Sequence, residues 1–333
     1  MTVVRSPLSV KALQFFALNA LLLALGYSAH AQQPTKIPRI GYLGNVSSSP
    51  RIATFRQGLR ELGYVEGKNI IIEWRHHEGK VDRLPTLAAE LVRLKVDIII
   101  TAGAPAARAA KEATSTIPIV MTQIGDPVGS GFVASLARPG GNITGLSILA
   151  PELSGKQLEL LKEIVPNLTR VAVFGTSTSP DNAQSLKEVE LAAKALKVQL
   201  QYLDIRNPKD FETAFRAAIE GRADAVLMMA AGGVVAAHRT QVVDLAVKGR
   251  LPVIYTNSLF VDAGGLMTYS ASITDLDRRA ATYVDRILKG AKPGDLPVEQ
   301  PTKFEFIINL KAAKQIGLVI PPNVLARADK IIR

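Results

Sequence analysis

The sequence contains no cysteine. This absence excludes a disulfide framework, a metal site built on thiolates and the lipid that exported bacterial lipoproteins carry on a cysteine. Histidine is scarce, with 4 residues in the chain. His76 and His77 would point to opposite faces of a strand, and His238 has no partner one helical turn further on. We therefore expect no metal ion in this protein.

The common catalytic motifs are also missing. The chain has no His-Glu-x-x-His, no phosphate-binding Gly-x-x-x-x-Gly-Lys, no Gly-x-Gly-x-x-Gly and no Gly-x-Ser-x-Gly. The glycine-rich run from Gly140 to Gly145 lacks the lysine of a phosphate loop, and we interpret it as a turn into a strand. We expect neither enzymatic activity nor a cofactor.

Residues 1–31 predict a cleaved signal peptide. Arg5 and Lys11 provide a short positive region, an apolar run over 12–25 follows, and Ala29-His30-Ala31 places small residues at the cleavage positions. A membrane anchor is the alternative, but a spanning helix needs about 20 apolar residues and this run is shorter. We expect cleavage after Ala31 and a mature protein that is free in the periplasm.

The charge of the chain is strongly positive, at +11. The basic residues are spread along the sequence without a lysine- or arginine-rich run, so they predict a solvated surface and no nucleic-acid partner. The mature chain from Gln32 onward is longer than one core usually requires and is typical of two domains. We expect a monomer.

Two parts of the mature chain repeat one pattern, in which a strand rich in Ile, Val or Leu is followed by a helix. The interval from one strand to the next is about thirty residues in both parts. Strands are expected at 39–44, 70–74, 97–101, 117–123 and 143–147, then at 171–175, 198–204, 225–230, 253–256 and 266–269. Helices are expected at 50–62, 81–94, 104–115 and 128–136, then at 181–196, 210–220, 234–249 and 274–290.

Strands that are apolar throughout are buried on both faces, which is typical of parallel sheets between helical layers. The prediction is an α/β fold of two doubly wound parallel-sheet lobes joined by a hinge of several strands. Lobe 1 spans 32–149 and lobe 2 spans 150–269, with the crossover near Pro151. The C-terminal segment 270–333, with a strand at 303–308 and a helix at 309–317, is expected to return to lobe 1.

Parallel sheets bind ligands beyond the carboxyl ends of their strands. The loops expected there are rich in small and capping residues, so a ligand site between the lobes is predicted. The residues that we expect to contact a ligand are Asn45, Ser48, Ala104, Ala106, Asp126, Ser177, Asn182, Gly232, Asn257 and Asp262.

The segment from Ala104 to Ala106 is the first choice for an anion seat, because free N–H groups at a helix start bind carboxylates and phosphates. Asp126 precedes a proline and has two interpretations, a helix cap or a contact to a ligand amine. Tyr42 stands near a strand end and would either stack on an aromatic ligand or pack in the core. Trp74, the one tryptophan, is expected in the core.

Several segments together resemble a known family. They are FRQGLRELGY at 55–64, DPVGSG at 126–131, LARPGGNITG at 136–145, GGLMTY at 264–269, INLKAAK at 308–314, IPP at 320–322 and RAD at 327–329. This set resembles the ABC-transporter substrate-binding proteins of the periplasmic type I fold, in the branch with tryptophan- and tyrosine-binding members. The resemblance implies a receptor that closes about a hinge and delivers a small ligand to a membrane permease.

Three functions are compared. The first is the solute-binding component of an ABC importer, whose ligand is an amino acid or related carboxylate. The alternative is a periplasmic sensor that closes on a ligand and signals to a membrane receptor, which the sequence does not distinguish from transport. An enzyme of the same fold is the third, and the missing motifs argue against it. A transcription regulator is excluded by the signal peptide and by the lack of a helix-turn-helix segment before Ile37.

Overall fold

The computed structural model describes residues 36–45, 50–177, 179–229 and 233–333. The predicted signal peptide and its cleavage site lie outside these residues, as do Ser48 and Gly232. Among the residues that are described, no helix is long and apolar enough to cross a membrane.

The first lobe contains a five-stranded parallel sheet in the order β2-β1-β3-β4-β5. Its strands are β1 (Arg39–Gly44), β2 (Ile71–His76), β3 (Ile98–Ala102), β4 (Ile119–Ile124) and β5 (Ile143–Ser147). The helices that connect them are α2 (Pro50–Glu61), α3 (Leu84–Arg93) and α4 (Ala104–Ala113), with the 3-10 turn η1 (Val81–Arg83) before α3.

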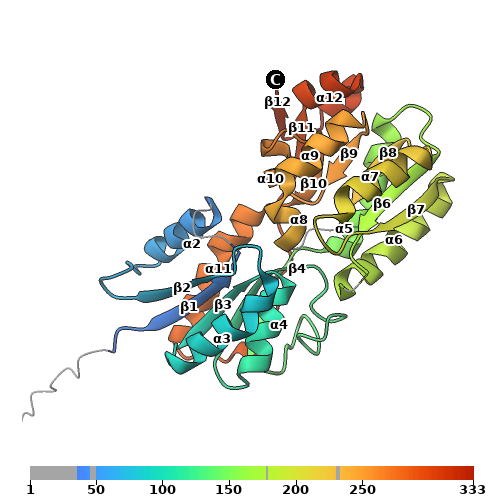
Figure 1. Ribbon diagram of the computed structural model, residues 1–333. Helices are drawn as coiled ribbons and strands as arrows, with labels where there is room; N and C mark the ends of the chain where they lie inside the picture. The colour runs from blue at the N-terminus through green and yellow to red at the C-terminus, as the bar shows by residue number, and fades with distance from the viewer. Residues whose placement is uncertain (1–35, 46–49, 178, 230–232) are drawn as a thin grey trace, which may run out of the picture. The chain divides into compact units, whose positions relative to one another are not determined.

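Each face of this sheet has its own apolar core, because neighbouring side chains of a strand point to opposite faces. Leu43 and Ile99 pack with α3 and α4 on one face, whereas Ile40 and Ile98 pack with α2 on the other. The strands therefore read as continuous apolar runs, and the parallel arrangement predicted from them is confirmed (Figure 1).

The second lobe contains a seven-stranded sheet in the order β12-β11-β10-β9-β8-β6-β7, in which only the described pair β10–β11 is antiparallel. The strands are β6 (Arg170–Gly175), β7 (Gln199–Asp204), β8 (Ala225–Met228), β9 (Val253–Tyr255), β10 (Met267–Ala271), β11 (Phe304–Asn309) and β12 (Lys330–Ile332). The helices are α5 (Ala150–Ile164), α6 (Pro180–Leu196), α7 (Asp210–Glu220), α8 (Gly233–Ala237), α9 (Arg239–Lys248), α10 (Ser258–Asp262), α12 (Leu310–Ile316) and α13 (Pro322–Leu325).

Helix α5 was not expected from the sequence, because Pro151 was interpreted as a break. In the structure Pro151 lies in the first turn of α5, where its missing N–H would have no partner in the helix in any case. Leu158 and Leu161 of α5 are buried against the second sheet. The proline therefore marks the start of a helix.

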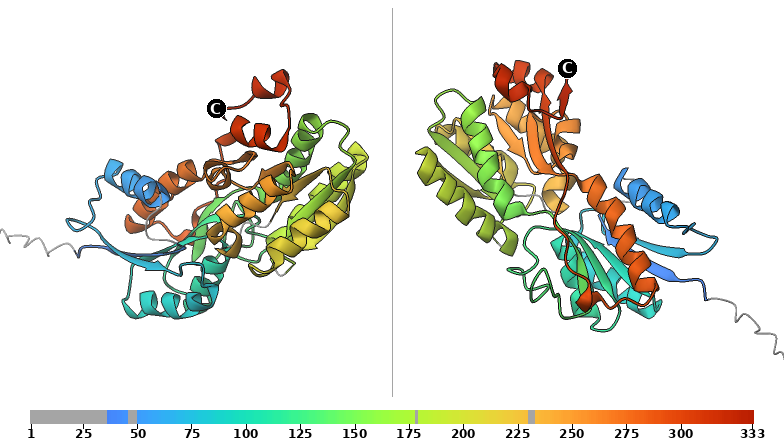
Figure 2. Two further views of the ribbon diagram at one scale, coloured as in Figure 1. Left: turned by 45° about the horizontal axis from the view of Figure 1, so that its top comes forward. Right: turned by 180° about the vertical axis from the view of Figure 1, so that it is seen from behind.

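Helix α11 (Ile273–Leu288) returns to the first lobe and packs against α2 (Figure 2). The two helices approach closely at Gly58, where an added Cβ atom would lie 2.6 Å from the carbonyl oxygen of Arg278. The chain then passes the 3-10 turn η2 (Pro293–Asp295) and enters the second sheet as β11 and β12. The expectation that all of 270–333 returns to lobe 1 therefore needs correction, because β11 pairs with β10 from Met267 to Ala271.

Two expected helices differ in the structure. Residues 128–136 form turns, with the N–H of Ser130 bonded to the carbonyl of Asp126 and that of Phe132 bonded to Pro127. The helix expected at 234–249 is divided into α8 and α9 at His238, whose ring Nδ1 lies 2.8 Å from the carbonyl oxygen of Val234. At His238 this contact between a side chain and the backbone competes with the helical hydrogen bonds.

Three segments connect the two sheets, after β5, after β10 and before β11. They lie side by side: the N–H of Ser147 bonds the carbonyl of Glu299 at 2.9 Å, and the N–H of Ser272 bonds that of Lys303 at 2.9 Å. Two parallel-sheet lobes joined by several extended segments is the fold class predicted from the sequence, and it is confirmed.

Candidate functional site

The carboxyl edge of the first sheet lies where β1, β3 and β4 end. Asn45 follows β1, and its side-chain oxygen accepts a 2.8 Å hydrogen bond from the N–H of Gly79. Gly79 follows β2, and a Cβ atom placed on it would lie 3.4 Å from the Cβ of Ala237 in α8. The edge of the first lobe therefore contacts a helix of the second lobe at this point.

The predicted anion seat begins α4 at the same edge. Gly103 caps the helix with a φ of 91°, a left-handed value that glycine adopts without strain. Ala104 is half-buried, and Ala106 is 1 % exposed. The predicted helix start is therefore present, and the burial of Ala106 leaves the first residues of α4 as its accessible part. An anion seat at this place stays a prediction.

Asp126 follows β4, and its carboxylate is used locally. One carboxylate oxygen accepts hydrogen bonds from the N–H groups of Val128 at 3.1 Å and Gly129 at 2.8 Å. This is the capping geometry that was one of its two interpretations, although it caps a turn and not a helix. A contact of Asp126 to a ligand stays a prediction.

A cluster of four polar residues at this edge was not found from the sequence. The members of the Arg51 cluster are Tyr42 of β1, Arg51 of α2, Gln123 of β4 and Asp277 of α11. Arg51 Nε donates to Asp277 at 2.8 Å, and Gln123 Nε2 donates to the other carboxylate oxygen at 3.4 Å. No sequence pattern connects these residues, because Arg51 and Asp277 are 226 positions apart.

The Arg51 cluster is buried unevenly. The side chain of Asp277 is 2 % exposed, and that of Arg51 is 20 % exposed. Burial raises the pKa of the Asp277 carboxyl group, and the Arg51 guanidinium partly offsets this rise. Burial, with the Asp277 charge, raises the pKa of Tyr42 to about 12, so this phenol stays neutral. The Arg51 side chain is therefore the more exposed member of the ion pair.

Aromatic side chains adjoin the Arg51 cluster. The ring centroids of Tyr42 and Trp74 are 5.0 Å apart, and Trp74 and His76 are stacked at 6.1 Å with an interplanar angle of 15°. The buried Nδ1 atoms of His76 and His77 have no hydrogen-bond partner in the part of the chain that is described. Burial lowers the pKa of both imidazoles, which favours their neutral forms. Trp74 was expected in the core, but it is only half-buried beside this cluster.

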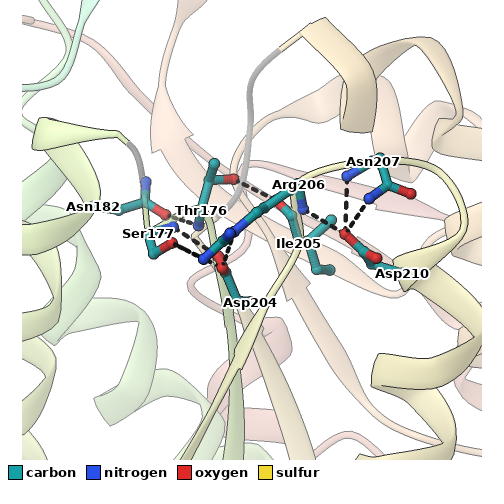
Figure 3. Close-up of polar contacts among 8 residues, drawn as sticks. All are labelled: Thr176, Ser177, Asn182, Asp204, Ile205, Arg206, Asn207 and Asp210. Atoms are coloured by element: carbon teal, nitrogen blue, oxygen red, sulfur yellow. Dashed lines mark hydrogen bonds and ion pairs between the residues drawn. The ribbon is translucent and has the colours of Figure 1, made fainter.

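The carboxyl edge of the second sheet carries a separate polar network (Figure 3). The Asp204 carboxylate accepts from the N–H of Ser177 at 2.7 Å, the hydroxyl of Ser177 at 2.8 Å and Arg206 Nε at 2.5 Å. The side-chain oxygen of Asn182 accepts from the N–H of Thr176 at 2.5 Å. The structure thus brings the predicted Ser177 and Asn182 to one edge, where both have partners within the protein.

Although its partial burial acts to raise it, the pKa of Asp204 lies below its usual range, because Ser177 and Arg206 donate hydrogen bonds to it. Asp204 therefore remains an anion, and its carboxylate already accepts hydrogen bonds from the N–H group and the hydroxyl of Ser177. Neither Asp204 nor Arg206 was predicted from the sequence, although Asp204 ends a predicted strand and that position was a usable signal.

The two other predicted residues lie after β9. Asn257 caps α10, and its side-chain oxygen accepts from the N–H of Leu259 at 3.1 Å. Asp262 is the last residue of α10 and is exposed, with its carboxylate 4.0 Å from Lys330 Nζ of β12. The structure thus places Asn257 at a strand end, whereas Asp262 lies one short helix further along the chain.

Within the described residues, no three side chains of His, Cys, Asp or Glu are grouped closely enough to hold an ion.

The chain was compared with known protein families. A family model for ABC transporter substrate binding proteins matches residues 47–332. The chain belongs to this family. The resemblance inferred from the sequence segments is thereby confirmed, and the family consists of proteins that bind solutes.

A curated relative of this substrate-binding protein is the tyrosine-binding protein of Clostridioides difficile strain R20291. It is 28 % identical over 265 residues, which cover 79 % of this chain and 75 % of the relative. Two solved structures have the same fold. A conserved domain protein of Vibrio cholerae has a TM-score of 0.81 and 30 % identity, with 89 % of this chain and 100 % of that one covered.

The second structure is a domain of Streptococcus pneumoniae in complex with L-Trp. It also has a TM-score of 0.81, with 27 % identity and with 89 % of this chain and 99 % of that one covered. Both the fold and the family of the chain are thus shared with proteins that bind aromatic amino acids.

Proposed function

We propose that the chain is the periplasmic solute-binding component of an ABC importer and that it captures an amino acid or related carboxylate between its two lobes. Membership of the substrate-binding family is the observation that carries this proposal. The permease of the importer is the partner, and the ligand leaves the protein chemically unchanged. Export depends on the predicted signal peptide at residues 1–31.

An aromatic amino acid is the ligand that we propose first. A relative is named for tyrosine, and a similar structure contains L-Trp. The aromatic side chains of Tyr42, Trp74 and His76 lie in the second halves of β1 and β2, towards the edge where parallel sheets bind ligands. The Tyr42 side chain is buried, whereas Trp74 and His76 are half-buried. Aromatic rings pack favourably in offset or edge-to-face pairs, so this wall suits a ring-bearing ligand.

The carboxyl edges of both sheets contribute to the proposed site. In the first lobe these are Asn45, Ala104, Ala106 and Asp126, and in the second lobe Ser177, Asn182 and Asn257. A ligand contact is also predicted for three further residues, which are Ser48, Gly232 and Asp262. The three connecting segments between the sheets are suited to a hinge, because opening and closing would change the dihedral angles of only a few residues.

The experiment is a ligand screen with the mature protein from Gln32 to Arg333. L-Tyrosine, L-tryptophan and benzoate are tested by thermal shift, and hits are measured by isothermal titration calorimetry. A ligand at 100 times its Kd stabilises the folded state by about 2.7 kcal/mol, which thermal shift detects. If no ligand in the panel binds, the proposed ligand class is wrong.

Transport and export need their own measurements. Ligand uptake into proteoliposomes that contain the permease should require this protein, and a binder that never stimulates uptake would contradict the importer role. N-terminal sequencing of the periplasmic fraction should begin at Gln32. An uncleaved N-terminus in the membrane fraction would favour the anchor that we rejected.

A further inference from the structure

The Arg51 cluster has features that a purely structural ion pair does not require. Its four members come from β1, α2, β4 and α11, and they meet at the edge where a parallel sheet binds ligands. A buried ion pair is rarely a good device for stability, because removing both charges from water costs about as much as their attraction returns. Its presence at this edge therefore points to a role other than stability.

The backbone at this place is unusual as well. Gln123 has a φ of 60°, the left-handed region that a residue with a Cβ atom rarely adopts. The register between β4 and β5 shifts between Met121 and Ile124, so Gln123 lies in an irregularity of the sheet. This irregularity directs the Gln123 amide to the Asp277 carboxylate at 3.4 Å. Such strain is concentrated at functional sites.

The different exposure of the two charged side chains indicates which kind of ligand group the cluster would bind. The Asp277 side chain is buried, with 2 % exposed, whereas the Arg51 side chain is 20 % exposed. The Asp277 carboxylate accepts a 2.8 Å hydrogen bond from Arg51 Nε, and this bond holds the planar guanidinium in one orientation. A guanidinium fixed in this way has N–H groups whose spacing and direction match the two oxygens of a carboxylate.

We propose that Arg51 binds the carboxylate of the ligand, that Asp277 and Gln123 are the positioning residues for Arg51, and that the ring wall of Tyr42, Trp74 and His76 adjoins the ligand side chain. The proposal rests on the proposed function and deepens it. It moves the carboxylate from the start of α4, where the sequence placed it, to a side chain of α2. The ligand class is an amino acid or arylcarboxylate, recognised by its carboxylate group, rather than a solute that has no carboxylate.

The test compares ligands that differ only in the carboxylate. Wild type and Arg51→Gln are titrated calorimetrically with L-tyrosine and L-tyrosinamide, and with L-tryptophan and L-tryptophanamide. Wild type should bind each acid about 10- to 100-fold more tightly than its amide, as one charged hydrogen-bonding anchor predicts. Arg51→Gln should bind the acid and the amide equally. Arg60→Gln is the matched control, because Arg60 lies in the last turn of the same helix and is exposed.

A double variant tests whether Arg51→Gln acts by unfolding the protein rather than by removing a ligand contact. Arg51→Gln leaves Asp277 as a buried charge, whereas the double variant Arg51→Gln with Asp277→Asn removes both charges. The double variant should also lose the preference for the acid. Asp277→Asn alone should keep part of the preference, because Arg51 remains but is less firmly oriented, and a merely structural Asp277 would leave the acid-to-amide ratio unchanged.

The outcomes separate the two proposals. If a folded Arg51 variant keeps the wild-type acid-to-amide ratio, Arg51 is not the carboxylate seat, although the chain is still a solute-binding protein. If wild type binds each acid and its amide equally, the ligand carboxylate is not recognised and the inference is overturned. If wild type binds neither the acids nor the amides, the proposed ligand class fails together with the inference.

Discussion

Replacing Asp277 with asparagine should destabilise the first lobe substantially. The carboxylate is 2 % exposed and accepts from Arg51 at 2.8 Å. Breaking a buried ion pair from one side costs about 3–5 kcal/mol, because the remaining charge is left without compensation. The Arg51 side chain is 20 % exposed, so water would solvate it in part. We therefore expect a loss of about 3 kcal/mol in the free energy of unfolding, the lower end of this range.

Urea denaturation at pH 7, followed by far-UV circular dichroism, measures this loss. The control is Glu159→Gln, which removes the same charge from an exposed pair. Glu159 lies 2.8 Å from Lys156, and the two side chains are 48 % and 43 % exposed. Exposed pairs of this kind contribute about 0–1 kcal/mol, so the control should be close to wild type.

A double substitution tests the cause of the loss. Arg51→Met with Asp277→Leu removes both charges and keeps apolar bulk, so it should recover most of the stability that Asp277→Asn loses. If Asp277→Asn costs no more than Glu159→Gln, the pair is not buried in the way described here, and the reasoning is refuted. If the double variant is less stable than Asp277→Asn, an unpaired charge is not the cause.

Three further variants test other features. Gly145→Ala should lower the free energy of unfolding in urea denaturation by about 3 kcal/mol or more, because a Cβ atom there would lie 2.0 Å from the carbonyl oxygen of Met121 and the φ of the residue is 140°. The control Gly141→Ala should lower it little, because nothing lies within 4 Å of an added Cβ atom. Equal losses in the two variants would contradict this prediction. Burial lowers the pKa of His77, so the unfolded chain takes up a proton more readily and stability should fall as pH drops below about 6.5. His77→Gln should show a smaller loss between pH 7.5 and pH 5.5 in the same assay, and an unchanged pH slope would argue against a buried neutral imidazole. Asn309→Ala should cost about 1 kcal/mol, since its side chain caps α12 through two N–H groups, and a melting temperature equal to that of wild type would show that the cap contributes nothing.

Local patterns predicted those elements whose signal lies within a few neighbouring residues. The apolar run at β3 and the periodic leucines of α3 are examples, and both are buried as expected. The same reasoning misjudged Pro151, because a proline breaks a helix interior but starts a helix equally well. It also missed β12, whose three residues form a strand only by pairing with β11.

The predicted site residues were chosen by their place at strand ends. This criterion selected Ser177 and Asn182, which lie at the edge of the second sheet. It did not select Arg51 or Asp277, because neither is conspicuous in its own segment. Arg51 lies at the start of the helix predicted at 50–62 and Asp277 lies in the helix predicted at 274–290, and the sequence assigned a ligand contact to neither residue.

The sequence by itself determined the two α/β lobes and the capping residues, since each depends on periodicity or on contacts between near neighbours. The resemblance to the family depends instead on a set of short motifs along the chain. Only the tertiary structure decided which charged groups meet at the edge of the first sheet. Helix α11 follows the second lobe in the chain, yet it returns to pack on α2, and this return brings Asp277 to Arg51 across 226 positions. No local pattern encodes such a meeting, because its stabilisation comes from burial between elements that the chain order separates.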